Sequence, residues 1–147
     1  VVCTGWRVGE AHWGGYAQKA RLKADWLVKL PTGLTTRNAM GLGAAGLTAA
    51  IALEALEAHG LTPDKGEVLI TGAAGGVGSF SVLLLATLGY KVAAATGRPE
   101  LEPYLKDLGA KTIIPLEIRS GRKTPSRTKI KNRFWHTLNF GVKFRNK

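Results

Sequence analysis

A glycine-rich turn joins an apolar run to a helical pattern at Glu67-Val68-Leu69-Ile70-Thr71-Gly72-Ala73-Ala74-Gly75-Gly76-Val77-Gly78-Ser79. The apolar run suits a buried parallel strand, and residues 77–88 suit a helix. Together they form a pyrophosphate cradle, because backbone N–H groups and the helix dipole point at the anion. The alternative is a turn that only lets the helix pack closely on the strand, a role expected for Gly78 in any case. We predict phosphate contacts from Ala73, Ala74, Gly75, Gly76, Val77 and Gly78.

The segment after the next expected strand indicates which nucleotide fits. An NAD-binding unit usually places Asp or Glu there to bind the ribose 2′-hydroxyl. This chain has Thr96-Gly97-Arg98 instead, and a guanidinium suits a 2′-phosphate. The alternative for Arg98 is a solvated side chain that pairs loosely with Glu102. We therefore predict NADPH as the cofactor, with Arg98 on its 2′-phosphate.

The pattern around the cradle predicts an α/β fold. Strands are expected at 67–71, 91–95 and 112–114, with helices at 77–88 and from Pro99 to Gly109. This βαβαβ order is half of a doubly wound Rossmann domain with a parallel sheet. Right-handed crossovers place both helices on one face of that sheet.

Upstream of the cradle, helices and strands are expected in a different order. Thr35 or Thr36 is a candidate cap for a short helix through Met40, and residues 44–58 predict a second helix that ends near Gly60. The second helix is expected to cover part of the other face of the sheet. Residues 1–9 and 16–22 have strand character, and the aromatic side chains near them, Trp13 and Tyr16, are predicted to be core rather than pocket residues.

A literal G-x-G-x-x-G occurs elsewhere, at Gly41-Leu42-Gly43-Ala44-Ala45-Gly46. The motif binds a dinucleotide only where it follows a strand and opens a helix. The residues directly before Gly41 predict no strand, because the turn at Pro31-Thr32-Gly33 and the helix through Met40 precede it. The cradle lacks the first glycine of the strict pattern, with Ala73 in its place, but it has the required context. We therefore interpret the match at Gly41–Gly46 as one that does not bind a dinucleotide.

The net charge of +11 is concentrated at one end of the chain. Residues 1–118 carry eleven Lys or Arg against ten Asp or Glu, whereas residues 119–147 carry ten Lys or Arg and no acid. This basic segment has no apolar periodicity, although it contains Phe134, Trp135 and Phe140. The composition predicts disorder or marginal structure there.

Several site classes find no support in the composition. The three histidines lack partners at ligand spacing, so no metal site is predicted, and no catalytic nucleophile with a base can be identified. The single cysteine, Cys3, excludes an internal disulfide and suits a reducing cytoplasm. The longest apolar stretches, 44–53 and 77–88, are too short to span a bilayer. A start at Val1, with Met40 as the only methionine, predicts part of a longer protein.

Residues 1–114 resemble the acryloyl-CoA reductase subgroup of the quinone-oxidoreductase-like, zinc-independent medium-chain dehydrogenases/reductases. The segments that carry the resemblance are 2–6, 14–17, 23–28, 46–49 and the cradle with Thr96-Gly97-Arg98. The resemblance implies NADPH-dependent hydride transfer to an enoyl thioester or a quinone, 2′-phosphate contacts from Thr96, Gly97 and Arg98, and a nicotinamide-side contact at Thr48. Ala44 stands where the family often has threonine. Family members are commonly homodimers.

The resemblance also implies an organisation into three parts. Residues 1–34 correspond to the end of a GroES-like substrate domain, and residues 35–117 to linking helices with the first Rossmann half. Residues 118–147 form a basic tail that resembles nothing in the family. Three functions stay open: an incomplete reductase, an NADPH-binding module without catalysis, and a non-specific nucleic-acid binder acting through the tail. We expect the first two over the third.

Overall fold

The computed structural model describes the backbone of residues 1–116, 118–119, 122–123 and 134–139, and the side chains of residues 1–116. The chain divides into two compact units, Val1–Leu47 and Thr48–Lys147. The cradle lies in the second unit.

The second unit contains a parallel sheet. Its strands are β1 (Glu67–Thr71), β2 (Lys91–Thr96), β3 (Thr112–Pro115) and β6 (Phe134–Asn139), in the order β3-β2-β1-β6. Leu69 aligns with Ala93 across β1 and β2, and Ala94 with Ile113 across β2 and β3. Two short strands, β4 (Ile118–Arg119) and β5 (Arg122–Lys123), form a separate antiparallel pair. The three predicted strands are confirmed, and the order is that of the first four strands of a Rossmann domain.

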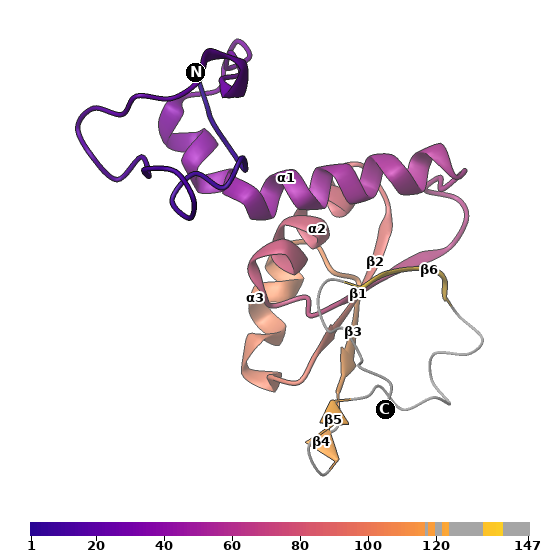
Figure 1. Ribbon diagram of the computed structural model, residues 1–147. Coiled ribbons are helices and arrows are strands. Elements are labelled where there is room, and N and C mark those ends of the chain that lie inside the picture. The colour runs from indigo at the N-terminus through magenta and orange to yellow at the C-terminus, as the bar shows by residue number, and fades with distance from the viewer. Residues whose placement is uncertain (117, 120–121, 124–133, 140–147) are drawn as a thin grey trace, which may run out of the picture. The chain divides into compact units, whose positions relative to one another are not determined.

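The crossover helices are α2 (Gly76–Thr87) and α3 (Glu102–Asp107), the latter preceded by the 3₁₀ turn η2 (Pro99–Leu101). They lie together beside the sheet (Figure 1), as right-handed crossovers require. Their buried side chains, which include Val82, Leu85 and Leu105, share one apolar cluster with alternate residues of β1 and β2. The intervening residues Leu69, Ala93 and Ala95 form a separate cluster with Ile114. The sheet therefore buries both faces, which explains the continuous apolar runs of its strands.

The helix α1 (Thr36–Ala58) consists of two helical parts, as the sequence predicted. Non-helical dihedral angles at Gly43 (φ 51°, ψ −156°) kink it between those two parts. The Asn38 N–H donates to Oγ1 of Thr35 (3.1 Å), which confirms a Thr35 cap. Gly60 ends the helix with φ 88°, and the Leu61 N–H bonds back to Leu56 O. Leu53 packs in the cluster of α2 and α3, so the expectation that this helix covers the other face is wrong.

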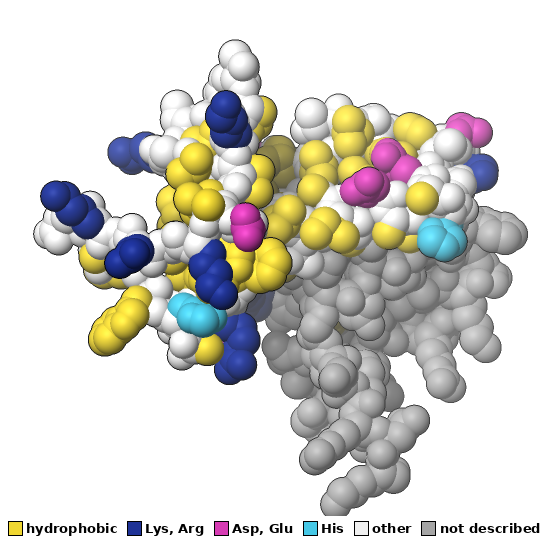
Figure 2. Space-filling view, turned by 45° about the horizontal axis from the view of Figure 1, so that its top comes forward, with side chains coloured by type: hydrophobic (Ala, Val, Ile, Leu, Met, Phe, Trp, Pro, Cys, Tyr) yellow, Lys and Arg dark blue, Asp and Glu magenta, His cyan; other side chains and the backbone are white. Residues whose placement is uncertain are grey.

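By length and composition alone, α1 could cross a membrane, with a mean hydropathy of 1.6 over its most apolar window. The expectation that every apolar stretch is too short therefore fails for this helix. Hydrophobic side chains are exposed on the protein surface (Figure 2), and on α1 they include Met40, Leu47 and Ile51. However, Leu53 belongs to the core, and the kink at Gly43 leaves too few continuous residues for a span of about 20. These features argue against a membrane span, although only 11% of that apolar window is buried.

The first unit has little regular structure. It contains the 3₁₀ turn η1 (Ala24–Trp26) and two isolated bridges, Val2 with Val28 and Val8 with His12. The strands predicted at 1–9 and 16–22 do not form: the first segment has only the bridges at Val2 and Val8, and the second has no strand residue. Trp13 and Tyr16 are almost fully exposed, so the prediction that they belong to a core is wrong.

The basic segment also differs from expectation. Phe134–Asn139 is a strand that pairs in parallel with β1 from Glu67 to Thr71, so the prediction of disorder fails for these residues. The same prediction for 120–121, 124–133 and 140–147 lies outside the described residues.

Candidate nucleotide-binding site

The cradle is built at the carboxyl end of β1. Gly72 has φ 60°, a conformation that favours glycine, and its carbonyl accepts the Gly75 N–H at 2.9 Å. Gly75 caps α2, and the first bond of the helix runs from the Ser79 N–H to Gly75 O at 2.8 Å. The N–H groups of the first turn therefore have no acceptor within the helix and, with the helix dipole, suit an anion.

Gly78 brings α2 close to β1. A Cβ on this residue would collide with the Gly72 carbonyl oxygen and would lie 2.7 Å from Cα of Ala73. Both obstacles are backbone atoms, so a side chain could fit only if the helix moved. The packing role that the sequence predicts for Gly78 is present in the structure. The first turn is also tied to the strand by the Ser79 hydroxyl, which donates to Ala73 O at 3.2 Å.

Arg98 reaches the cradle from the end of β2. Its Nη2 donates to the carbonyl oxygen of Ala74 at 3.2 Å, and the side chain is exposed to solvent. The alternative pairing with Glu102 is not what the structure shows, because Glu102 pairs with Lys106 at 2.8 Å. A guanidinium thus lies at the edge of the predicted anion-binding turn, with most of its N–H donors available to a ligand.

The pairing of β1 with β2 brings the predicted site residues together. The Ala73 N–H donates to Ala95 O at 3.3 Å, which joins the start of the cradle to the end of β2. Thr96 is buried, whereas Gly97 is half-buried. Thr48 comes from a different element: it lies exposed on α1, just after the kink. Its nicotinamide contact stays a prediction.

A cavity that the sequence did not indicate adjoins the cradle. It has a volume of about 280 Å³, and its walls include Ser79, Leu83 and Tyr104 together with the backbone of the cradle. Residues 79 and 83, and residues 104 and 108, are each one helical turn apart. Each pair therefore lies on one face of its own helix. The sequence could have indicated the cavity only if the two helices had been known to be neighbours.

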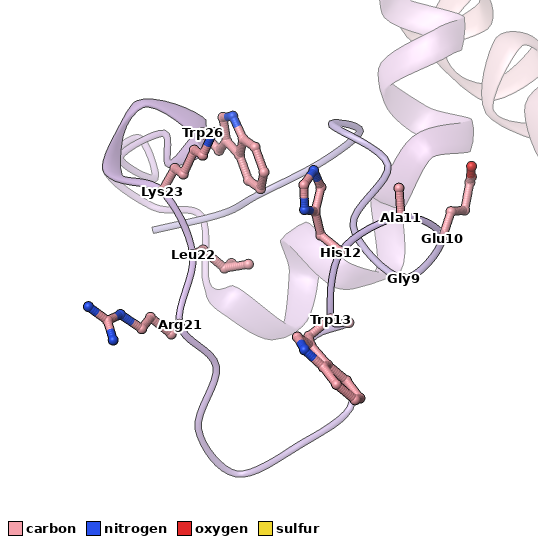
Figure 3. Close-up of a pocket in the computed structure, with 10 residues that line it drawn as sticks. Gly9, Glu10, Ala11, His12, Trp13, Arg21, Leu22, Lys23 and Trp26 are labelled. Atoms are coloured by element: carbon pink, nitrogen blue, oxygen red, sulfur yellow. The ribbon is translucent and has the colours of Figure 1, made fainter.

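A second cavity, of about 650 Å³, lies in the first unit (Figure 3). Trp26 stacks on Trp6 with ring centroids 5.7 Å apart, and Nζ of Lys23 lies 5.2 Å from the Trp26 ring centroid. The His12 ring points toward Trp26, while the Arg21 side chain points away from it (Figure 3). The aromatic rings thus pack on one another and on Lys23 within the unit. The described residues that line this cavity do not form a cluster of catalytic groups. Among the described residues, no group of three His, Cys, Asp or Glu could hold a metal ion.

Comparisons with known proteins give clear relatives, although no protein-family model matches the chain. The acrylyl-CoA reductase AcuI of Ruegeria pomeroyi is 62% identical over 131 residues, which is 88% of this chain and 40% of that protein. YhfP of Bacillus subtilis, named as a quinone oxidoreductase, is 46% identical over 80% of this chain and 36% of its own length. The chain thus spans about two fifths of the length of these relatives.

Solved structures agree. The yhdH oxidoreductase of Salmonella enterica in complex with NADP is 57% identical, with a TM-score of 0.75 over 77% of this chain and 35% of that one. The yhfP protein of Bacillus subtilis with NAD bound is 46% identical, with a TM-score of 0.75 over 77% of this chain and 34% of its own.

A match over 88% of a 147-residue chain must extend beyond residue 118. The assignment of residues 118–147 to a separate tail stays a prediction. Over the stretch shared with these proteins, the chain belongs to the acrylyl-CoA reductase and quinone-oxidoreductase group of the medium-chain dehydrogenases/reductases.

Proposed function

We propose that this chain is the NADPH-binding part of an oxidoreductase that reduces the C=C bond of an enoyl thioester, or a quinone. The observation that carries the proposal is the position of Arg98. Its guanidinium lies against Ala74 in the phosphate cradle, where a 2′-phosphate and a pyrophosphate of one nucleotide can be bound together. The names of the relatives support the two acceptor classes.

The residues present fit such a cofactor. The N–H groups of Gly76, Val77 and Gly78 open α2 and would hold the pyrophosphate. Gly97 and Arg98, which follow Thr96 at the end of β2, would lie on the 2′-phosphate side. Thr48 would contact the nicotinamide, as the family resemblance implies. When bound, the nicotinamide supplies a hydride, and this chain's residues bind and orient the nucleotide.

The choice of NADPH over NADH rests on charge. The structures of relatives hold NADP in one case and NAD in another, so family membership alone leaves the nucleotide open. In this chain, no Asp or Glu occupies Thr96-Gly97-Arg98, where a carboxylate would repel a 2′-phosphate. We extend the proposal to a cytoplasmic homodimer that acts on a small-molecule acceptor, without a membrane or nucleic-acid partner.

A titration of the purified chain with NADPH and NADH, followed by nucleotide fluorescence, tests the proposal. Arg98→Ala is expected to weaken NADPH binding roughly tenfold to a hundredfold and to change NADH binding little, because charged hydrogen bonds contribute about 1.5–3 kcal/mol. Lys91→Ala is the matched control, since Lys91 is an exposed cation at the opposite end of β2. Equal affinity for both nucleotides, or an Arg98→Ala chain that keeps its selectivity, would contradict the proposal.

A second assay separates an active reductase from a binding module. NADPH oxidation is measured with an enoyl-CoA and with a quinone as acceptor. Turnover with either acceptor supports the reductase. NADPH-selective binding without turnover identifies this chain as a cofactor-binding module, because hydride transfer also needs an acceptor held at near-attack distance.

A further inference from the structure

We propose that Thr96 is a positioning residue for Arg98 and not itself a contact to the nucleotide, an inference that rests on the proposed NADPH site. Thr96 is the last residue of β2 and only 6% exposed. Its Oγ1 accepts the Arg98 N–H at 3.1 Å and lies 3.5 Å from the Arg98 carbonyl oxygen. The hydroxyl is thus directed at the backbone of the residue that carries the guanidinium.

The backbone of Thr96 is fixed as well. Its carbonyl oxygen accepts the Leu116 N–H at 2.8 Å, which ties the end of β2 to the residue that follows β3. Gly97 contributes no comparable constraint. A Cβ there would meet Leu116 only at 3.7 Å or more, which is ordinary van der Waals contact. The Thr96 hydroxyl is therefore the local bond that sets the direction in which Arg98 leaves the sheet.

Arg98 is consequently held at both of its ends. The N–H is held by Thr96, and Nη2 by the carbonyl oxygen of Ala74 at 3.2 Å. An exposed arginine otherwise samples many rotamers and loses that freedom when it binds a ligand. Fixing it beforehand lowers the ordering penalty of binding and so raises affinity for the one nucleotide that carries a 2′-phosphate. The effect of Thr96 should therefore appear as nucleotide selectivity.

The experiment is a set of NADPH and NADH titrations of the full chain carrying Thr96→Val, Thr96→Ser, Arg98→Ala, or Thr96→Val with Arg98→Ala. We expect Thr96→Val to raise the Kd for NADPH roughly threefold to tenfold, the effect of one lost hydrogen bond. The Kd for NADH should change by less than about twofold, and Thr96→Ser should restore NADPH binding. In the Arg98→Ala chain, Thr96→Val should have no further effect, because the two residues act as one unit.

A matched control is Thr87→Val, which removes a hydroxyl that donates to Leu83 O on α2 and should leave both affinities unchanged. Equal weakening of both nucleotides by Thr96→Val, or a full additional effect in the Arg98→Ala chain, would overturn the inference. If Thr96→Val fails to fold, Thr96→Cys gives the same test with a weaker acceptor. An unaltered chain that binds NADPH and NADH equally would overturn the proposed function, whereas a selective chain with an insensitive Thr96 would overturn only this inference.

Discussion

The Tyr90 hydroxyl donates a 2.7 Å hydrogen bond to Oε1 of Glu57 and so joins the residue before β2 to the last turns of α1. Tyr90 is only 6% exposed. Burial raises its pKa to about 12, with further contributions from the hydrogen bond to Glu57 and from its negative charge. The residue belongs to the buried cluster that supports the cradle strand, so its protonation state bears on the stability of the whole second unit.

We expect this pair to give stability a distinct alkaline dependence. The folded-state pKa of Tyr90 lies above the ordinary tyrosine value of 10.0, so folding favours the protonated phenol. Its stabilisation is complete below about pH 10 and is lost as the pH rises toward about 12. Urea unfolding of the wild-type chain and of Tyr90→Phe, compared between pH 8 and pH 12, measures this. The free energies of unfolding of the two chains should converge over that window, and a constant difference would contradict the assignment.

Gly78→Ala should disrupt the cradle. The new Cβ would meet the Gly72 carbonyl oxygen and Cα of Ala73, and neither can rotate away. We expect a loss of at least about 1–3 kcal/mol in the free energy of unfolding, as in other overpacked sites, together with weaker nucleotide binding. Chemical unfolding followed by circular dichroism measures the first, and NADPH titration the second. A chain with unchanged stability would show that α2 can move away from β1 freely.

Gly41→Ala tests the literal glycine motif. Gly41 lies inside α1, and a Cβ there would meet nothing within 4 Å. The substitution should therefore stabilise the helix by about 1 kcal/mol, because alanine has the higher helix propensity. NADPH binding should stay unchanged. Weaker binding would place the nucleotide at Gly41–Gly46 and contradict the cradle at Ala73–Gly78.

The parts that sequence predicted correctly are those fixed by local chemistry. The apolar run, the glycines and the Thr35 cap each specify their own backbone, so β1, the cradle and the start of α1 were predictable. Strand pairing is not local. Residues 16–22 alternate like a strand but pair with no strand in the described part of the chain, whereas Phe134–Asn139 lies in a basic segment and pairs with β1. The sequence also could not reveal the bonds from Arg98 to Ala74 and to Thr96, since these depend on how β1 and β2 align.

Two glycines that follow helices allow the contributions of backbone strain and of side-chain packing to the free energy of unfolding to be measured separately. Gly89 and Gly109 both have positive φ, 85° and 105°, and each follows a helix of the second unit. A Cβ on Gly89 would meet nothing within 4 Å, whereas one on Gly109 would lie 2.5 Å from Cβ of Ala86. Gly89→Ala should lower the free energy of unfolding by about 1–2 kcal/mol, through backbone strain alone.

Gly109→Ala should lower the free energy of unfolding by about 1–3 kcal/mol more than Gly89→Ala, because Ala86 lies on α2 and the collision forces the end of α3 away from it. Ala86→Gly removes the colliding atom. In the chain that carries Ala86→Gly, Gly109→Ala should therefore lower the free energy of unfolding by about as much as Gly89→Ala does in the wild-type chain. Urea unfolding of the four variants measures the difference. If Ala86→Gly gives no such rescue, strain at the backbone and not contact between α2 and α3 accounts for the glycine at position 109.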